Sequence, residues 1–166
     1  MASRLIVVAT VLFSVLLARA NAAPISPETI RTAMRDVEVR LSARGVEVKG
    51  YDASRLPEVE IVPPTHIYLQ GNDGGYVDGR IFLSETVNAD CMGLALVHEL
   101  VHDASVKYRL FPHVGNGEIR DMFEALADLV TADAAQDPYR PGCLPDRDFG
   151  IAIADLAKLA MATPPS

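Results

Sequence analysis

Residues 94–107, with the sequence LALVHELVHDASVK, decide how the middle of this 166-residue chain folds. Apolar residues recur there at the three- and four-residue spacing of an amphipathic helix. The side expected to face the core comprises Leu96, Val97, Leu100, Val101 and Ala104. Positions four apart lie on one face of a helix, one turn from each other. We therefore expect His98 and His102 to point their imidazole rings in the same direction.

The two histidines and Glu99 together form the pattern H-E-x-x-H. Imidazole nitrogens are preferred zinc ligands. A carboxylate that directly follows the first histidine can act on a water molecule at the metal without being a ligand itself. The spacing is typical of zinc hydrolases, chiefly peptidases. The alternative, two solvated histidines beside a surface glutamate, accounts for the spacing less well.

A catalytic zinc site needs a third protein ligand in addition to two histidines. The pattern H-E-x-x-H-x-x-G-x-x-H would supply a histidine, but its last two defined positions hold Ser105 and Tyr108 here. The other histidines of the chain are His66 and His113. Glu124 is the stronger candidate because it lies on a second predicted helix.

That second helix is expected from about residue 118 to residue 134, with Glu124 and Asp128 on the face opposite its apolar residues. The helical pattern by itself favours two solvated acids, since most acids on amphipathic helices face water. The upstream H-E-x-x-H pattern requires a third ligand, and this requirement favours Glu124 as a metal ligand.

The two motifs, HELVH at 98–102 and EALAD at 124–128, resemble the gluzincin group of zinc peptidases, which includes thermolysin-like enzymes. The resemblance implies a Zn²⁺ ion with three protein ligands, namely His98, His102 and Glu124. It implies that Glu99 is the catalytic base. Asp128 would hold a ligand histidine through the distal N–H of its ring.

The same group uses a Tyr or His as a hydrogen-bond donor to the transition state. His113, in the loop between the two metal-binding helices, is a tentative candidate for this role, and Tyr108 and Tyr139 compete with it. The alternative for His113 is an ordinary surface histidine. The chain departs from thermolysin-like enzymes in having few residues after Glu124, where those enzymes have a large second subdomain that forms the far wall of the cleft.

The segments around the motifs predict an α+β fold with a minimal zincin-like domain. Ser26-Pro27-Glu28 is a helix start, and Gly45 a helix stop. The apolar face between them comprises Ile30, Met34, Val37 and Leu41. Extended segments are expected at Val46–Lys49, Glu58–Val62, His66–Leu69 and Arg80–Leu83. They would form a small mixed or antiparallel sheet packed on this helix and on the H-E-x-x-H helix, with the Glu-bearing helix and a C-terminal helix near 149–161 following.

The Gly- and Asp-rich segment 71–79 is interpreted as a hairpin turn, because it lacks the ligand alternation and closing Glu of a calcium loop. One strand of the 66–69/80–84 hairpin is expected to be an exposed edge. Asn88 or Asp90 is expected to cap the H-E-x-x-H helix, which should run to about Lys107.

The first residues have the pattern of an export signal. A short basic start is followed by an apolar run from Leu5 to Ala18 and an A-x-A site at 20–22, so cleavage after Ala22 is expected. An uncleaved membrane anchor is the alternative, but the apolar run is short for a membrane span. We expect residues 1–22 to be a signal peptide and 23–166 a single secreted or periplasmic domain, with membrane contact only through the transient signal peptide.

The net charge of −7 argues against nucleic acid as a partner, since a phosphate backbone binds basic surfaces. The two cysteines, Cys91 and Cys143, are expected to form a disulfide in an oxidising compartment. Two buried free thiols are the alternative. The bond would connect the start of the H-E-x-x-H helix to a segment beyond the Glu-bearing helix.

Together these features predict an exported zinc-dependent peptidase that acts on a peptide or protein substrate. One alternative is a catalytically inactive protein of the cell envelope that keeps the zinc site for binding or structure. A second alternative is a domain without metal that relies on its disulfide for stability. The sequence does not indicate the substrate or the oligomeric state.

Overall fold

The fold was obtained as a computed structural model that describes residues 24–112, 116–136 and 143. This part of the chain contains three helices and three strands, which confirms the predicted α+β class. In order, the elements are α1 (Pro27–Ala43), β1 (Glu58–Val62), β2 (Gly74–Val77), β3 (Arg80–Ser84), α2 (Ala89–Lys107) and α3 (Asn116–Ala135). The expected signal peptide and C-terminal helix lie outside the described residues, as do His113 and Tyr139.

Helix α1 forms as its sequence predicts. The Ser26 side chain accepts a hydrogen bond from the backbone N–H of Thr29, and Pro27 occupies the first turn, where its missing N–H costs nothing. The predicted apolar face is buried, and Gly45, with φ of 76°, follows the last turn. Local chemistry therefore determines both ends of this helix.

The sheet has the strand order β1-β3-β2, with β1 parallel to β3 and β2 antiparallel to it. The turn between β2 and β3 is the dipeptide Asp78-Gly79, and both residues have positive φ, 49° and 82°. Two consecutive residues with positive φ form a type I′ turn, whose twist matches that of the two strands it connects. Strand β3 is thus central, and β2 forms one edge of the sheet.

Two of the predicted extended segments are wrong. Residues 46–49 and 66–69 form turns and irregular structure, and the strand that pairs with β3 in the hairpin is instead β2, inside the segment 71–79 assigned to a turn. Glycine is depleted in strands, so the pair Gly74-Gly75 favoured a turn and the strand β2 was not predicted. The Asp-Gly signal of a tight hairpin was present four residues later, and it sets the register.

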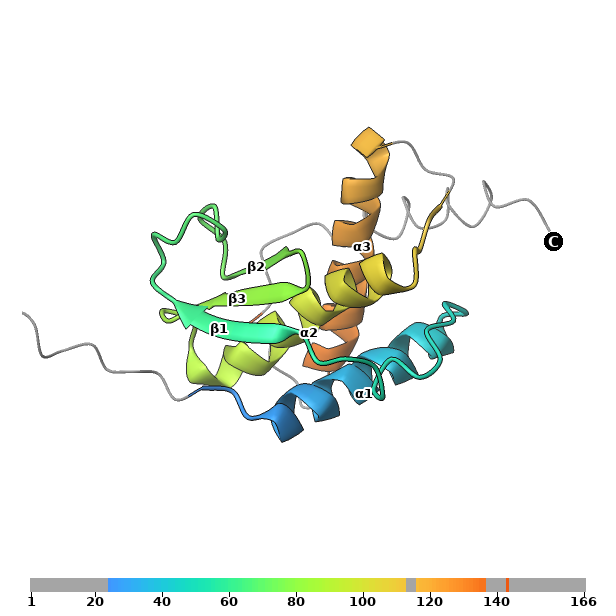
Figure 1. Ribbon diagram of the computed structural model, residues 1–166, viewed down its shortest axis with the longest axis horizontal. Coiled ribbons are helices and arrows are strands. Elements are labelled where there is room, and N and C mark those ends of the chain that lie inside the picture. The colour runs from blue at the N-terminus through green and yellow to red at the C-terminus, as the bar shows by residue number, and fades with distance from the viewer. Residues whose placement is uncertain (1–23, 113–115, 137–142, 144–166) are drawn as a thin grey trace, which may run out of the picture.

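Helix α2 is the centre of the molecule. It contacts α1, α3, β2 and β3, and Figure 1 shows the three strands beside it on one side and α3 crossing it on another. Asn88 caps this helix by accepting from the N–H of Asp90, so of the two predicted caps Asn88 is the one used. The predicted core side of α2 is buried in the main hydrophobic cluster. In the described part of the chain, no helix is long and apolar enough to cross a membrane.

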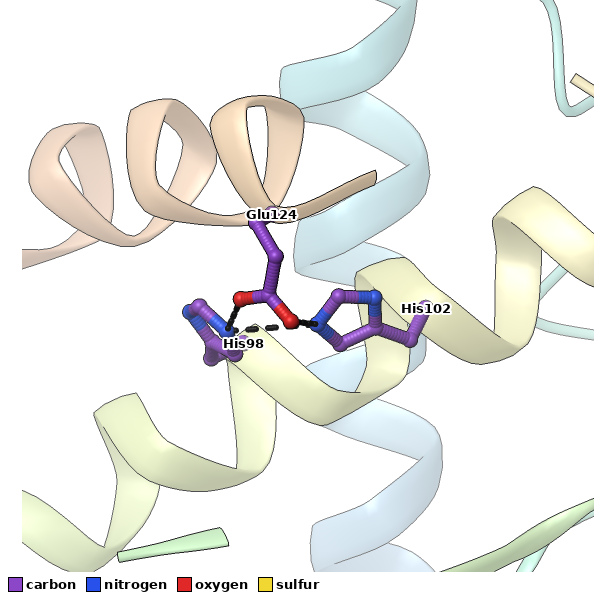
Figure 2. A group of neighbouring side chains, drawn as sticks. All are labelled: His98, His102 and Glu124. Atoms are coloured by element: carbon purple, nitrogen blue, oxygen red, sulfur yellow. Dashed lines mark hydrogen bonds and ion pairs between the residues drawn. The ribbon is translucent and has the colours of Figure 1, made fainter. Parts of the chain in front are cut away.

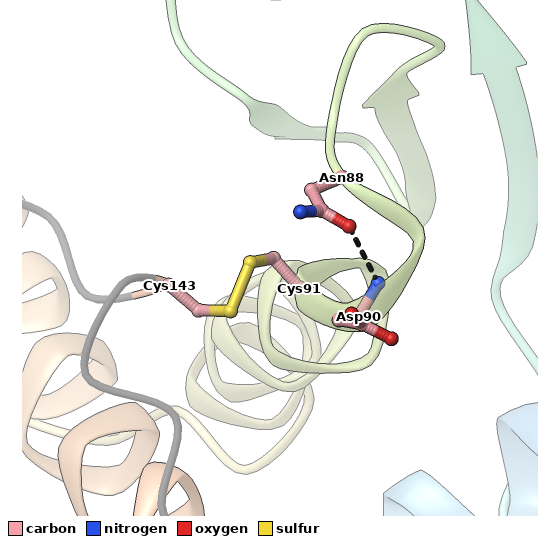
Figure 3. The surroundings of a disulfide bond; sticks show 4 residues. All are labelled: Asn88, Asp90, Cys91 and Cys143. Atoms are coloured by element: carbon pink, nitrogen blue, oxygen red, sulfur yellow. Dashed lines mark hydrogen bonds between the residues drawn. A yellow bond between two sulfur atoms is a disulfide. The ribbon is translucent and has the colours of Figure 1, made fainter.

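The predicted disulfide is present. Cys91, in the first turn of α2, bonds to Cys143 with an S–S distance of 2.03 Å, and Figure 3 shows the bond beside the Asn88 cap. The two cysteines are 52 residues apart in the sequence. It fixes the chain beyond α3 against the helix that carries both histidines.

Candidate metal centre

His98 and His102 lie one turn apart on α2 and direct their rings toward the same point (Figure 2). Their Nε2 atoms are 3.2 Å apart. Both residues are half-buried, and both line the cavity described below. The i, i+4 spacing therefore produces the convergence of ring nitrogens that it predicts.

Glu124 reaches the same point from α3. Its Oε2 atom lies 3.5 Å from Nε2 of His98, and its Oε1 atom lies 3.8 Å from Nε2 of His102. Zinc–ligand bonds of about 2.1 Å at tetrahedral angles place neighbouring donor atoms roughly 3.4 Å apart. The separation of the two ring nitrogens and the two distances to the Glu124 carboxylate oxygens fall close to this value, so the three side chains could hold a metal ion.

Asp128 follows Glu124 by one turn of α3 and is buried. Its Oδ1 atom lies 3.5 Å from Nδ1 of His98, on the side of the ring away from Glu124. The interpretation of Asp128 as a solvated acid is therefore wrong. A carboxylate at this position orients the ring and makes its other nitrogen a better ligand.

The charges around His98 act in opposite directions on its pKa. Burial lowers the pKa, but the hydrogen bond to Glu124 and the negative charges of Glu99, Asp128 and Glu124 outweigh burial, and the net effect is a raised pKa. The site therefore attracts positive charge. A divalent cation satisfies the same carboxylates without requiring a protonated imidazole.

Glu99 lies next to the three-residue cluster and is only 5% exposed. Burial raises its pKa to about 7, with the His98 charge lowering it and the Glu124 charge raising it. A carboxylate with a pKa near neutrality can both accept and return a proton. This environment fits the role predicted for Glu99 as a general base.

Gly74 of β2 explains how a buried carboxylate fits under the sheet edge. A Cβ atom at this position would lie 2.5 Å from Oε1 of Glu99 and 2.9 Å from its Cγ atom. Only glycine lets the strand approach so closely. The sequence-based interpretation missed Gly74, although a Gly pair in the segment before an Asp-Gly turn was a signal of close backbone approach.

The spacing of alternate residues along strand β2 matches the spacing of successive turns along helix α2. Gly74 lies over Glu99, and two residues later burial, together with the negative charge of Asp103 one turn after Glu99, raises the pKa of Tyr76 to about 12. Two strand residues span roughly 6.7 Å and four helix residues roughly 6 Å, so successive turns of α2 meet alternate residues of β2.

The cluster opens into a cavity of about 870 Å³. Its walls are the segment 68–77, which includes β2, the segment 86–88, one face of α2, α3 residues between Arg120 and Thr131, and Cys143. A cavity of this size accommodates several residues of an extended peptide.

The other predicted alternatives lie elsewhere. The Tyr108 hydroxyl donates to the carbonyl of Lys49 at 3.0 Å, away from the cavity lining, so Tyr108 is not placed as a transition-state donor. His66 stacks on Phe82 and contacts Tyr68 in a small aromatic cluster, and it is not part of the metal-binding group.

No protein-family model, curated protein or solved structure matches this chain. The resemblance to the gluzincin group therefore depends on the two motifs at 98–102 and 124–128. The convergence of His98, His102 and Glu124 from two helices is the structural finding that supports it.

Proposed function

We propose that this protein is an exported zinc-dependent peptidase. The observation that carries the proposal is the convergence of His98, His102 and Glu124 beside the buried Glu99, at the wall of a cavity large enough for a peptide. A metal-binding group with a structural role only would not need a buried carboxylate with a pKa near neutrality beside it.

The chemistry divides between the metal and the protein. When bound, zinc supplies Lewis acidity, which polarises the scissile carbonyl and makes a water molecule more acidic. Glu99 takes a proton from the attacking water and passes it to the departing amine. Asp128 holds the His98 ring so that Nε2 faces the metal position, and Gly74 leaves the Glu99 carboxylate room beneath β2.

Strand β2 is the element that suits an extended substrate. It forms an edge of the sheet, and among the described residues no strand pairs with its outer side. All four residues of β2 line the cavity. A peptide that pairs with an open strand edge gains main-chain hydrogen bonds without sequence specificity, and here it would lie over the metal-binding face of α2.

Export is part of the proposal, and the disulfide supports it. A bond between Cys91 and Cys143 forms and persists in oxidising compartments. A peptidase outside the cytosol can act on peptide substrates without cleaving cytosolic proteins of its own cell.

The decisive experiment compares wild type with Glu99→Gln. We expect the variant to retain one equivalent of zinc and to lose about 10²- to 10⁴-fold in kcat/KM on a peptide library, because the ligands remain and only the base is removed. Glu28→Gln, at an exposed position of α1, is the matched control and should keep full activity. Equal activity of Glu99→Gln would refute the mechanism. Zinc binding without cleavage by wild type would favour an inactive zinc protein of the cell envelope.

A further inference from the structure

The cavity continues past the metal-binding cluster toward the C-terminal end of α2, and this end has a distinct chemistry. Val106 lies one turn after His102 and is 49% exposed, although it is apolar and lines the cavity. Phe123, from α3, lines the same end and contacts the ring of Phe111 at a centroid distance of 5.9 Å. These side chains form an apolar wall beside the position of the metal.

Arg120 supplies a positive charge at this end. It lies on α3 one turn before Glu124, is exposed, and is the only Arg or Lys among the described residues that line the cavity. The acids that line the cavity are Asp73, Glu99, Glu124 and Asp128. The cation therefore stands out in a cavity whose other charged groups are acidic, in a chain with a net charge of −7.

Most other described arginines are engaged by the protein itself. The arginines that contact a carboxylate or a backbone carbonyl are Arg31, Arg35, Arg40, Arg44 and Arg80. Arg120 has no such partner among the described residues, and the exposed Arg55 and Arg109, which share this property, lie away from the cavity lining. A guanidinium held at a cavity rim without an internal partner is available to a ligand.

The distance along α3 indicates which part of a peptide would meet this group. Four helix residues separate Arg120 from Glu124, which corresponds to roughly 6 Å along the axis. An extended peptide advances about 3.3 Å per residue. A carboxylate that reaches Arg120 would thus belong to a residue about two positions from the scissile bond.

We propose that Arg120, with Val106 and Phe123, forms a subsite that binds a substrate carboxylate about two residues from the cleaved bond, beside an apolar side chain. A guanidinium binds a carboxylate through two parallel hydrogen bonds. The carboxylate has two sources, the free C-terminus of a peptide or an Asp or Glu side chain within one. This inference rests on the proposed peptidase function, since it names the substrate class of the same site.

The test uses two pairs of peptides made of alanine and leucine. The first pair are pentapeptides with a free C-terminal carboxylate or an amide, in which two residues follow the third bond. The second pair are hexapeptides with aspartate or asparagine two residues from the central bond. We expect wild type to favour one acidic member by about tenfold in kcat/KM, mainly through KM. Arg120→Gln should bring that ratio to about one, Arg120→Lys should restore part of it, and Arg120→Glu should reverse it. Arg55→Gln, the same change at an exposed position outside the cavity, should keep the wild-type ratio.

Affinity measurements separate this inference from the proposed function. We expect zinc-loaded Glu99→Gln to bind peptides without cleaving them, so titration calorimetry of Glu99→Gln with and without Arg120→Gln measures the carboxylate preference even if wild type shows no turnover. A tenfold loss of affinity for the acidic peptide on adding Arg120→Gln supports the subsite. Equal affinity of acidic and neutral peptides for Glu99→Gln overturns it, whichever source of carboxylate is used.

Discussion

Two faces of α2 contain or contact an acidic side chain, and they differ in where the cation that balances the acid comes from. On one face, Asp103 is fully buried and pairs with Nζ of Lys107 at 2.7 Å, while the Tyr51 hydroxyl donates to its Oδ2 atom at 2.9 Å. On the other face, Glu124 contacts two imidazole rings whose charge depends on protonation. The first site has its cation within the protein, whereas the second is suited to an external cation.

This difference shows how one helix separates stability from function. The ion pair of Asp103 with Lys107 and the hydrogen bonds of Tyr51 hold α2 against the segment after α1, and none of these three residues lines the cavity. The histidine face, one residue away in the sequence, stays half-buried and open. Changes on the two faces should therefore affect different measurements, and the variants below test that separation.

The largest effect is expected from Asp103→Asn. This change removes the buried charge that pairs with Lys107 and accepts a hydrogen bond from the Tyr51 hydroxyl, which should lower the free energy of unfolding by about 2–3 kcal/mol while zinc stoichiometry stays unchanged. Urea unfolding of the metal-free protein measures the loss. The control is Asp133→Asn, which removes the exposed ion pair with Arg44 and should cost less than about 1 kcal/mol. Similar losses for both variants would refute the distinction between the two faces.

Glu124→Gln should show the opposite behaviour. The loss of a charged ligand should reduce zinc affinity by about 100-fold, whereas the unfolding free energy of the metal-free protein should change by less than about 1 kcal/mol. Competition with a chromophoric chelator measures the affinity. An unchanged affinity would mean that another residue is the third ligand.

Asp128→Asn should have a smaller effect on the same quantity. Asparagine keeps the size of the side chain but removes the charge next to Nδ1 of His98, so zinc affinity should fall by about tenfold. The chelator competition assay applies again. Loss of affinity as large as that of Glu124→Gln would make Asp128 a direct ligand.

Gly74→Ala should give the smallest change, with about a fivefold loss of kcat/KM at full zinc occupancy. The added methyl group would displace the Glu99 carboxylate, and a small shift of a catalytic group is enough to slow a reaction. Gly93→Ala is the matched control, because a Cβ at that position of α2 meets nothing within 4 Å. Equal activity of the two variants would show that Gly74 does not position Glu99.

Several features of the fold were predictable because they depend on neighbours in the chain. The cap at Ser26, the apolar face of α1 and the i, i+4 geometry of His98 and His102 follow from helix geometry and short-range hydrogen bonds. Strand β2 was missed because its glycines have low strand propensity. The glycine at position 74 leaves room for the Glu99 carboxylate of α2, and strand propensity does not take account of such a contact between elements.

By itself, the sequence determined the features that depend on local geometry and residue counts. These are the helices, the convergence of two histidines and the bridge between the two cysteines of the chain. Tertiary structure decided which face of α3 meets α2. The helical pattern of α3 favoured solvent for Glu124 and Asp128, yet packing brings the first to the histidines and buries the second. Tertiary structure also brought the Tyr51 hydroxyl, from a distant part of the chain, to donate a hydrogen bond to Asp103. The physical reason is that periodicity reports which residues share a face, whereas the free energy of the whole packed core selects what each face contacts.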